Sequence, residues 1–152
     1  MHDILITADN LSYKINENRL FSSVSFSLKK GECLHIKGSN GSGKSTLLRI
    51  ILGITSPTKG EIKAHVKKNI SYLGHKNALK SYLSVEDNIT LMRLSNHKDL
   101  KGYLETLSLK KLLDIKVANL SYGQQKKLAL LRIFLGNTNL IVLDEPFVGL
   151  DI

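Results

Sequence analysis

Residues 38–45 read G-S-N-G-S-G-K-S, a glycine-rich loop of the kind that binds the phosphates of a nucleotide. The segment before it, 32–37, has the apolar pattern of a short strand, and the segment after it, 44–52, has the pattern of a helix. Glycines let the backbone wrap around phosphate oxygens, and the helix directs its first amides at the same anion. We expect Lys44 to reach the β- and γ-phosphates and the Ser45 hydroxyl to bind Mg²⁺. This strand–loop–helix unit predicts an α/β fold.

Two further motifs follow in the second half of the chain. Residues 120–124 read L-S-Y-G-Q, in which Ser121 and Gln124 have the spacing of a helix capping box. Residues 140–145 read L-I-V-L-D-E, an apolar run typical of a strand buried on both faces of a parallel sheet, followed by two carboxylates. Each motif alone is weak, because an ordinary helix cap and a surface turn before Pro146 explain them as well. Their order behind a phosphate loop is what makes them informative.

The three motifs in this order resemble the ATP-binding cassette (ABC) ATPases, and the resemblance covers essentially the whole chain. It implies a P-loop NTPase fold of the ABC type, with an antiparallel β-subdomain and a short helical insert. We expect one ATP-binding domain over residues 1–152, with its helical subdomain at about 76–120, that stops after the loop at 149–151. In this family two domains enclose two ATP molecules head to tail. The L-S-x-G-Q motif, called the signature, binds the ATP held by the other subunit.

The resemblance implies a role for each motif residue. Asp144 would hold Mg²⁺ together with Ser45, and Glu145 would polarise the attacking water. Tyr13 would stack on the adenine ring, although a tyrosine of the core is the alternative. The residues expected to contact ATP are Tyr13, Gly38, Ser39, Asn40, Gly41, Ser42, Gly43, Lys44, Ser45, Thr46, Ser121, Gly123, Gln124 and Asp151.

His75 departs from the family pattern, which has glutamine in the loop that contacts Mg²⁺ and the membrane partner. Because a neutral imidazole accepts or donates a hydrogen bond as glutamine does, the resemblance implies a catalytic role for His75, with a solvated loop histidine as the alternative. The strings Y-L-G-H at 72–75 and L-S-Y-G-Q-Q-K-K-L-A-L-L-R at 120–132 are similar to the ATP-binding subunits of haem exporters used in cytochrome c maturation. This implies two partners, membrane-spanning exporter subunits and a second copy of the chain. It also implies a peripheral location on the cytoplasmic face of the inner membrane.

Periodicity and turn residues predict the other elements. Ser84, with Asp87 three residues on, is expected to cap a helix. Cys33 falls in the strand before the loop, where we expect a small buried thiol. Strands are expected at 4–15, 24–28, 32–37, 61–66, 70–73 and 140–143, and helices at 44–52, from 84, at about 99–107 and from 121 to the residue before Gly136.

The charge of the chain raises a competing interpretation, because a net charge of +9 and a pI near 9.7 are typical of proteins that bind nucleic acid. The basic residues are mostly lysines in scattered doublets, however, and aromatic residues make up only 6% of the chain. A basic surface facing water or anionic lipid explains them, so no nucleic acid partner is expected. The absence of a long apolar run or signal sequence, with a single cysteine, favours an intracellular protein.

Three functions stay open from the sequence. The first is ATP hydrolysis coupled to haem export, and the second is a soluble ABC ATPase acting on ribosomes or nucleic acid, a class that usually carries two cassettes in one chain. The third is a truncated product without catalysis. None of the five histidines takes the position of the family's switch histidine, which contacts the γ-phosphate, so the resemblance implies little or no ATP turnover by this polypeptide.

Overall fold

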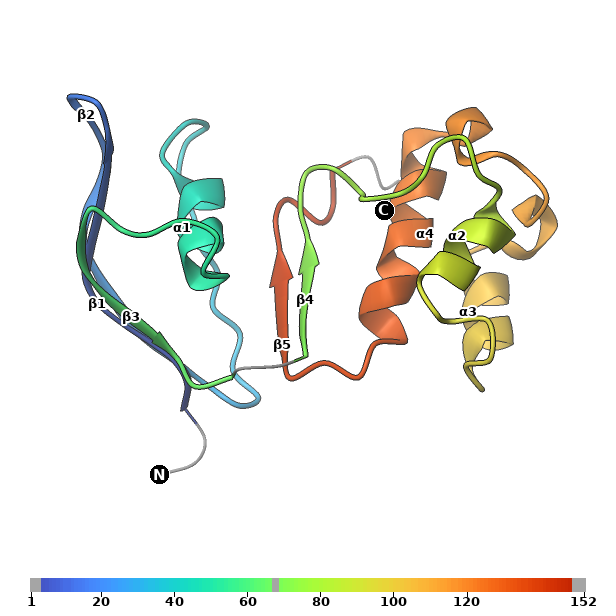
Figure 1. The fold of residues 1–152 in the computed structure, drawn as a ribbon, viewed down its shortest axis with the longest axis horizontal. Helices are drawn as coiled ribbons and strands as arrows, with labels where there is room; N and C mark the ends of the chain where they lie inside the picture. The colour runs from blue at the N-terminus through green and yellow to red at the C-terminus, as the bar shows by residue number, and fades with distance from the viewer. Residues whose placement is uncertain (1–3, 67–68, 149–152) are drawn as a thin grey trace. The chain divides into compact units, whose positions relative to one another are not determined.

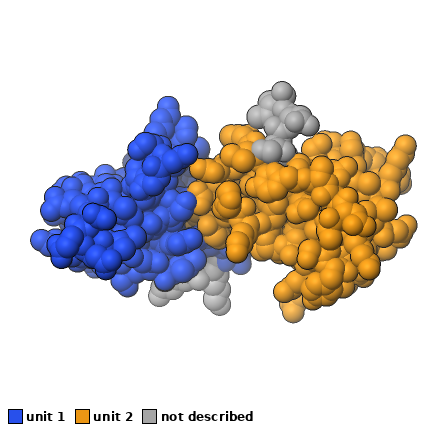
Figure 2. Space-filling view, turned by 90° about the horizontal axis from the view of Figure 1, so that it is seen from above, with its two compact units in different colours: residues 1–70 blue, residues 71–152 orange. Residues whose placement is uncertain are grey.

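The computed structural model describes residues 4–66 and 69–148. The chain divides into two compact units, residues 1–70 and residues 71–152 (Figure 2). The loop predicted at 149–151, with the candidate site residue Asp151, lies outside the described residues.

The first unit contains a three-stranded antiparallel sheet in the order β2-β1-β3. β1 (Ile4–Ile15) and β2 (Asn18–Lys29) form a long hairpin, and β3 (Lys59–Ala64) pairs with the other side of β1. β1 begins and ends as predicted, whereas β2 is longer than the predicted 24–28 and β3 begins two residues before the predicted 61–66. The unit therefore contains the antiparallel β-subdomain that the sequence predicts.

Helix α1 (Lys44–Ile51) follows the phosphate loop and lies beside this sheet (Figure 1). It buries Leu47, Ile50 and Ile51, whose spacing places them on one face of the helix. Gly53 follows the helix with φ 71°, the left-handed conformation typical of a residue just after a helix C-terminus. The helix predicted at 44–52 is confirmed.

The strand predicted at 32–37 is wrong, because these residues form no regular element. Leu34 is 40% exposed and Cys33 is exposed, so the buried thiol predicted at Cys33 is also wrong. A strand of a parallel sheet obtains its hydrogen bonds from strands that lie far away in the sequence. Within the residues that the structure describes, no strand pairs with this segment. An apolar sequence pattern alone is not enough to form a strand without such neighbours.

The second unit alternates a small sheet with helices. β4 (Ile70–Leu73) and β5 (Leu140–Leu143) are neighbours in a two-stranded sheet, and Figure 1 shows their arrows pointing the same way. None of the described helices is long and apolar enough to cross a membrane. The elements between the two strands are α2 (Val85–Leu91), α3 (Leu100–Thr106), the 3₁₀ turns η1 (Lys110–Leu112) and η2 (Val117–Asn119), and α4 (Tyr122–Phe134).

Both predicted capping boxes are present. The Asp87 N–H donates to Ser84 Oγ at 3.0 Å, and the Ser84 N–H donates to Asp87 Oδ2 at 3.1 Å. The hydrogen bonds from Ser84 hold the pKa of Asp87 below its ordinary value. At the start of α4, the Gln124 N–H donates to Ser121 Oγ at 3.2 Å and the Ser121 N–H donates to Gln124 Oε1 at 2.9 Å. Each helix therefore begins at the residue that the sequence indicates.

Helix α4 is covered on two sides. One face, with Leu128 and Leu131, joins a buried cluster with the other helices. A second face, carrying Ala129 and Ile133, packs against Leu73 at the end of β4. The buried members of the first cluster are Val85, Ile89, Leu94, Leu104, Leu109, Val117, Leu120, Leu128, Leu131 and Leu135.

The burial predicted for β5 on both faces is wrong. Leu140 and Val142 are buried, whereas Ile141 is 48% exposed and Leu143 is 37% exposed. Among the described residues β5 pairs only with β4, so its side chains alternate between a covered face and an open one. The strand itself is present at the predicted residues.

Replacing a leucine in the helical cluster is expected to destabilise the second unit. Leu128→Ala removes a side chain that is 0% exposed and leaves a cavity, which should lower the free energy of unfolding by about 2–5 kcal/mol. Leu91→Ala is the matched control, because Leu91 is 60% exposed and should change that free energy by less than about 0.5 kcal/mol. Urea unfolding followed by circular dichroism measures both. Equal destabilisation by the two variants would contradict the cluster.

Candidate nucleotide-binding site

The phosphate loop wraps around the side chain of its own lysine. Lys44 Nζ donates to the backbone carbonyl oxygens of Gly38 and Ser39, each at 2.9 Å. A Cβ on Gly38 would lie 2.5 Å from Ser42 Oγ, so any other residue there would require the Ser42 side chain to move. Gly41, at φ 81°, takes the left-handed conformation that the loop requires. The loop is therefore held in a ring with the Lys44 ammonium at its centre.

The first amides of α1 are left available to an anion. Gly43 is the N-cap residue, at φ 93°, and no side chain caps the helix. There is also no acidic residue in the first turn of α1. The unpaired N–H groups of a helix N-terminus carry partial positive charge, which Lys44 increases. The loop and helix together can bind phosphate oxygens with backbone donors and one ammonium group.

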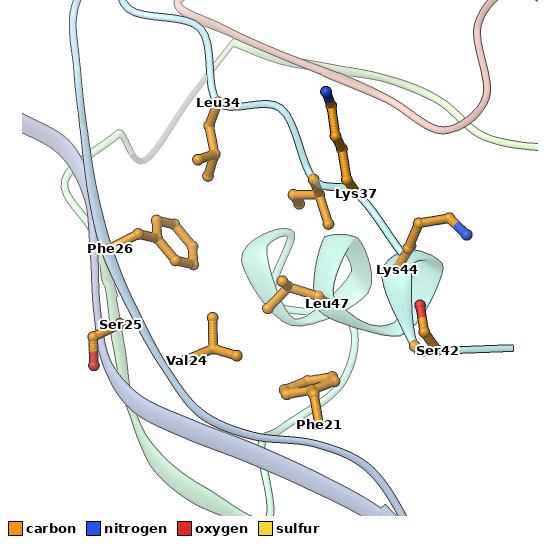
Figure 3. A pocket seen from close by; sticks show the side chains of 11 residues that line it. Phe21, Val24, Ser25, Phe26, Leu34, Lys37, Ser42, Lys44 and Leu47 are labelled. Atoms are coloured by element: carbon orange, nitrogen blue, oxygen red, sulfur yellow. The ribbon is translucent and has the colours of Figure 1, made fainter. Parts of the chain in front are cut away.

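A pocket of about 350 Å³ opens beside the loop (Figure 3). Its apolar lining comes from β2, α1 and the irregular segment before the loop, and Ser42 and Lys44 lie at its polar side. Apolar walls do not suit phosphates, so the phosphate site is the loop itself and not this pocket. The side chains that line the pocket include Phe21, Val24, Phe26, Leu34, Lys37, Ser42, Lys44 and Leu47.

Phe21 lies between Tyr13 and the phosphate loop and contacts both. The two rings stack with centroids 6.3 Å apart and planes inclined by 24°. A Cβ on Gly43 would lie 2.9 Å from Phe21 Cδ1, so the Phe21 ring contacts the loop directly. Tyr13 itself is half-buried. Sequence reasoning missed Phe21. The hairpin turn at 16–17 could have indicated Phe21. This turn sets the register of the two strands, and in that register Tyr13 pairs with Phe21.

In the second unit, the ends of β4 and β5 bring His75 and Glu145 together. His75 Nδ1 lies 4.0 Å from Glu145 Oε2, and the two side chains are 75% and 44% exposed. Glu145 has φ 50°, an uncommon conformation for a residue other than glycine. The two strands are neighbours, so the residues that follow them in sequence lie close together.

Asp144, the last residue before Glu145, is buried at 6% exposure. Its N–H donates to the carbonyl oxygen of Leu73 at 2.8 Å, which continues the hydrogen bonding between the strands. Its carboxylate makes no hydrogen bond or ion pair with the residues that the structure describes. An ionised carboxylate without a protein partner is available to a cation or to bound water.

The signature begins α4 and is open to solvent. Ser121 and Tyr122 are exposed, and Gly123 and Gln124 are half-buried. Ser121 uses its hydroxyl oxygen as an acceptor for the Gln124 amide, so the ordinary cap that the sequence offered as an alternative is present. The cap does not exclude a second use, because the hydroxyl hydrogen and the first helix amides are still free to donate to an anion. Asp144, Glu145, His75 and the signature all belong to the second unit, and the phosphate loop belongs to the first.

Comparison with known proteins shows one family. The model of the ABC transporter family, described as "ABC transporter", matches residues 21–148. Among curated proteins, the cytochrome c biogenesis ATP-binding export protein CcmA of Brucella abortus (strain 2308) is 35% identical, over 96% of this chain and 73% of the relative. The protein of the same name from Dechloromonas aromatica (strain RCB) is 36% identical, over 97% of this chain and 80% of the relative.

Solved structures agree with this. A structure titled as the ATP-binding subunit of an ABC transporter has a TM-score of 0.82 at 26% identity, over 97% of this chain and 68% of its own. The cbiO1 protein of Clostridium perfringens, part of the ABC transporter complex cbiONQ, has a TM-score of 0.76 at 25% identity, over 99% of this chain and 68% of its own. The first is titled as an ATP-binding subunit and the second as part of an ABC transporter complex.

Proposed function

The chain belongs to the ABC transporter family of ATP-binding ATPase domains, and from this we propose that it hydrolyses ATP as a head-to-tail dimer that drives an export complex. The observation that carries the proposal is that both halves of such a site occur in one chain. The phosphate loop before α1 is one half, and the open signature at the start of α4 is the other. The signature is exposed to solvent in the monomer, so it would contact ATP only when a second copy of the chain binds.

The first half binds ATP through the loop at 38–46. Backbone amides and the Lys44 ammonium contact the phosphates, and Lys44 exchanges its bonds to Gly38 and Ser39 for bonds to phosphate oxygens. Tyr13, supported from behind by Phe21, stacks on the adenine ring. Stacking needs only an aromatic face, which a half-buried tyrosine provides.

The chemistry of two oxygen donors suits Mg²⁺. Hard cations of this kind take oxygen ligands and keep several waters, and Ser45 and Asp144 supply a hydroxyl and a free carboxylate. Mg²⁺ would neutralise charge on the phosphates during the reaction.

Glu145 orients and polarises the attacking water, and His75 acts on Glu145. The 4.0 Å separation between His75 Nδ1 and Glu145 Oε2 allows a small rearrangement to bring them into hydrogen-bond distance. Glu145 adopts a strained backbone conformation. A hydrogen bond from His75 would hold the Glu145 carboxylate in one direction. His75 would in this way assist catalysis from the position where most members of the family have glutamine.

The second half acts on the other subunit. Ser121, Gly123 and Gln124 begin α4, whose N-terminal amides and dipole attract the γ-phosphate of the ATP bound by the partner copy. Asp151 would communicate across the same dimer.

The export function is inferred from the relatives. The Brucella and Dechloromonas proteins are named as cytochrome c biogenesis ATP-binding export proteins, and we extend this to export of haem for cytochrome c biogenesis. The partners would then be membrane-spanning exporter subunits, and the chain would lie peripherally on the cytoplasmic face of the inner membrane. The net charge of +9 favours contact with anionic lipid at that face.

ATP-dependent dimerisation tests the proposal. The Glu145→Gln variant keeps the size of the side chain but lacks a carboxylate, so ATP should persist in the dimer instead of being hydrolysed. Light scattering should give 16.9 kDa without nucleotide and twice that mass with ATP and Mg²⁺, whereas ADP should leave the mass unchanged because it lacks the γ-phosphate. A mass that does not respond to ATP, in a protein that calorimetry shows to bind it, would contradict the dimer.

A further inference from the structure

Lys126, in the second turn of α4, is unusual among the lysines because it is only 1% exposed. Within residues 4–66 and 69–148, its ammonium makes no hydrogen bond and no ion pair. Lysine is almost never this far buried unless its side chain is paired. The surroundings of Lys126 are therefore expected to contain an acceptor.

Asn77, between β4 and α2, is a buried polar residue whose side-chain oxygen accepts no hydrogen bond from the described residues. It is 8% exposed, and its Oδ1 has no hydrogen-bond partner in the part of the chain that the structure describes. Asn88 shows the ordinary situation. It is 2% exposed, and its carboxamide makes three hydrogen bonds, one from the Lys80 N–H and two to the carbonyl oxygens of Lys80 and Ser84. Unpartnered buried oxygens are rare enough in folded proteins to need an explanation.

The packing of α4 on β4 places the two groups at the same level. Arg132 Nη2 donates to the carbonyl oxygen of Tyr72 at 3.1 Å, and Leu73, the next residue, packs against Ala129. The helix therefore runs antiparallel to the strand, as Figure 1 shows. Residues beyond Leu73 then lie beside the turn of α4 that precedes Ala129. Leu79 confirms this, because it packs against both hydrophobic clusters of α4.

Lys126 occupies that turn. It precedes Ala129 by three residues, which places it on the same face of the helix and roughly 4.5 Å further along the axis. Leu79, in the segment after β4, packs against the hydrophobic clusters of α4, and the same segment, residues 74–79, contains both Asn77 and His75. The register of α4 on β4 therefore puts Lys126 and the unpartnered Asn77 Oδ1 near one interface, between α4 and the loop that carries His75.

We propose that Lys126 is a positioning residue whose ammonium donates to Asn77 Oδ1, directly or through one water, and thereby fixes the loop that places His75 beside Glu145. Because Lys126 lies one turn after the signature, a shift of α4 would reach His75 through Asn77. That consequence for ATP chemistry rests on the proposed function, whereas the contact itself does not.

A charge-replacement cycle tests the contact. Asn77→Asp puts a carboxylate at the acceptor, which should pair with Lys126 and leave the midpoint of urea unfolding unchanged or higher. In a Lys126→Met background, where methionine replaces the lysine stem with an apolar chain, Asn77→Asp should lower that midpoint by about 1 M. Lys127→Met is the matched control, and in that background Asn77→Asp should behave as in the parent. The same loss in both backgrounds would overturn the proposal.

The positioning role needs a separate measurement. The imidazole signals of His75 in an NMR spectrum, assigned by their loss in His75→Gln, should move in Lys126→Met and stay in place in Lys127→Met. Unchanged His75 signals in Lys126→Met would overturn the positioning role. Both measurements are made without nucleotide, so a negative result leaves the proposed function intact, and failure of ATP-dependent dimerisation leaves the contact intact.

Discussion

Lys44→Ala is expected to weaken ATP binding by roughly 100-fold, because it removes the one ammonium group inside the phosphate loop. A hydrogen bond between charged groups is stronger than a neutral one, and we expect this single side chain to contact several phosphate oxygens. The substitution also releases the carbonyl groups of Gly38 and Ser39, which Lys44 holds together at 2.9 Å before ATP arrives. The loop therefore loses both its charge and the bonds that shape it. Isothermal calorimetry with ATP measures the change.

Lys37→Ala is the control for this result. Lys37 lines the same pocket next to the loop, but in Figure 3 its side chain points away from Lys44. A variant at Lys37 removes the same charge from the same region, so it should change ATP affinity by less than about threefold. Equal losses from the two variants would mean that general positive charge attracts ATP, and unchanged binding in Lys44→Ala would contradict the phosphate-loop assignment.

Gly123→Asp is expected to abolish ATP-dependent dimerisation while leaving ATP binding by the monomer within about twofold. The new carboxylate would stand where the signature meets the γ-phosphate of the partner's ATP, and two like charges at that distance repel strongly in a closed interface. The variant should fold, because an acidic residue in the first turn of a helix interacts favourably with the helix dipole. Light scattering with and without ATP, in the Glu145→Gln background, gives the result.

Gly102→Asp controls for the addition of charge. Gly102 also lies in the first turn of a helix, α3, and a Cβ there would meet no atom within 4 Å. This variant carries the same charge and should dimerise like the parent. If Gly123→Asp still dimerised with ATP, the signature would have no contact with nucleotide in the partner copy.

Local signals in the sequence predict most of the second unit correctly. The capping boxes at Ser84 and Ser121 determine the start of two helices through hydrogen bonds within three residues, so no distant part of the chain is needed. Predictions of strand pairing and burial that depend on residues far away in the sequence are less accurate. The segment 32–37 forms no strand, and β5 is covered on one face only, because in both cases the missing determinant is a pairing or packing partner and not the sequence of the element.

The same distinction applies to the site. The phosphate loop follows from its own glycines and lysine. The approach of His75 to Glu145 depends on β4 and β5 being neighbours, which no pattern in either segment indicates. Burial of Lys126 could not be predicted either, because it depends on a second covered face of α4, the one that carries Ala129 and Ile133 and packs against Leu73 of β4. A lysine at such a position is ordinarily expected in solvent.

The most direct test of the central claim is to mix two defective copies. Lys44→Ala lacks a working phosphate loop, and Gly123→Asp lacks a working signature, so neither variant alone should form an ATP-dependent dimer. In a head-to-tail pair of the two variants, one site is intact. It combines the phosphate loop of the Gly123→Asp copy with the signature of the Lys44→Ala copy. Light scattering of the mixture with ATP, in the Glu145→Gln background, should therefore show dimers. A mixture that stays monomeric, when the doubly intact protein dimerises under the same conditions, would contradict a site shared between two copies.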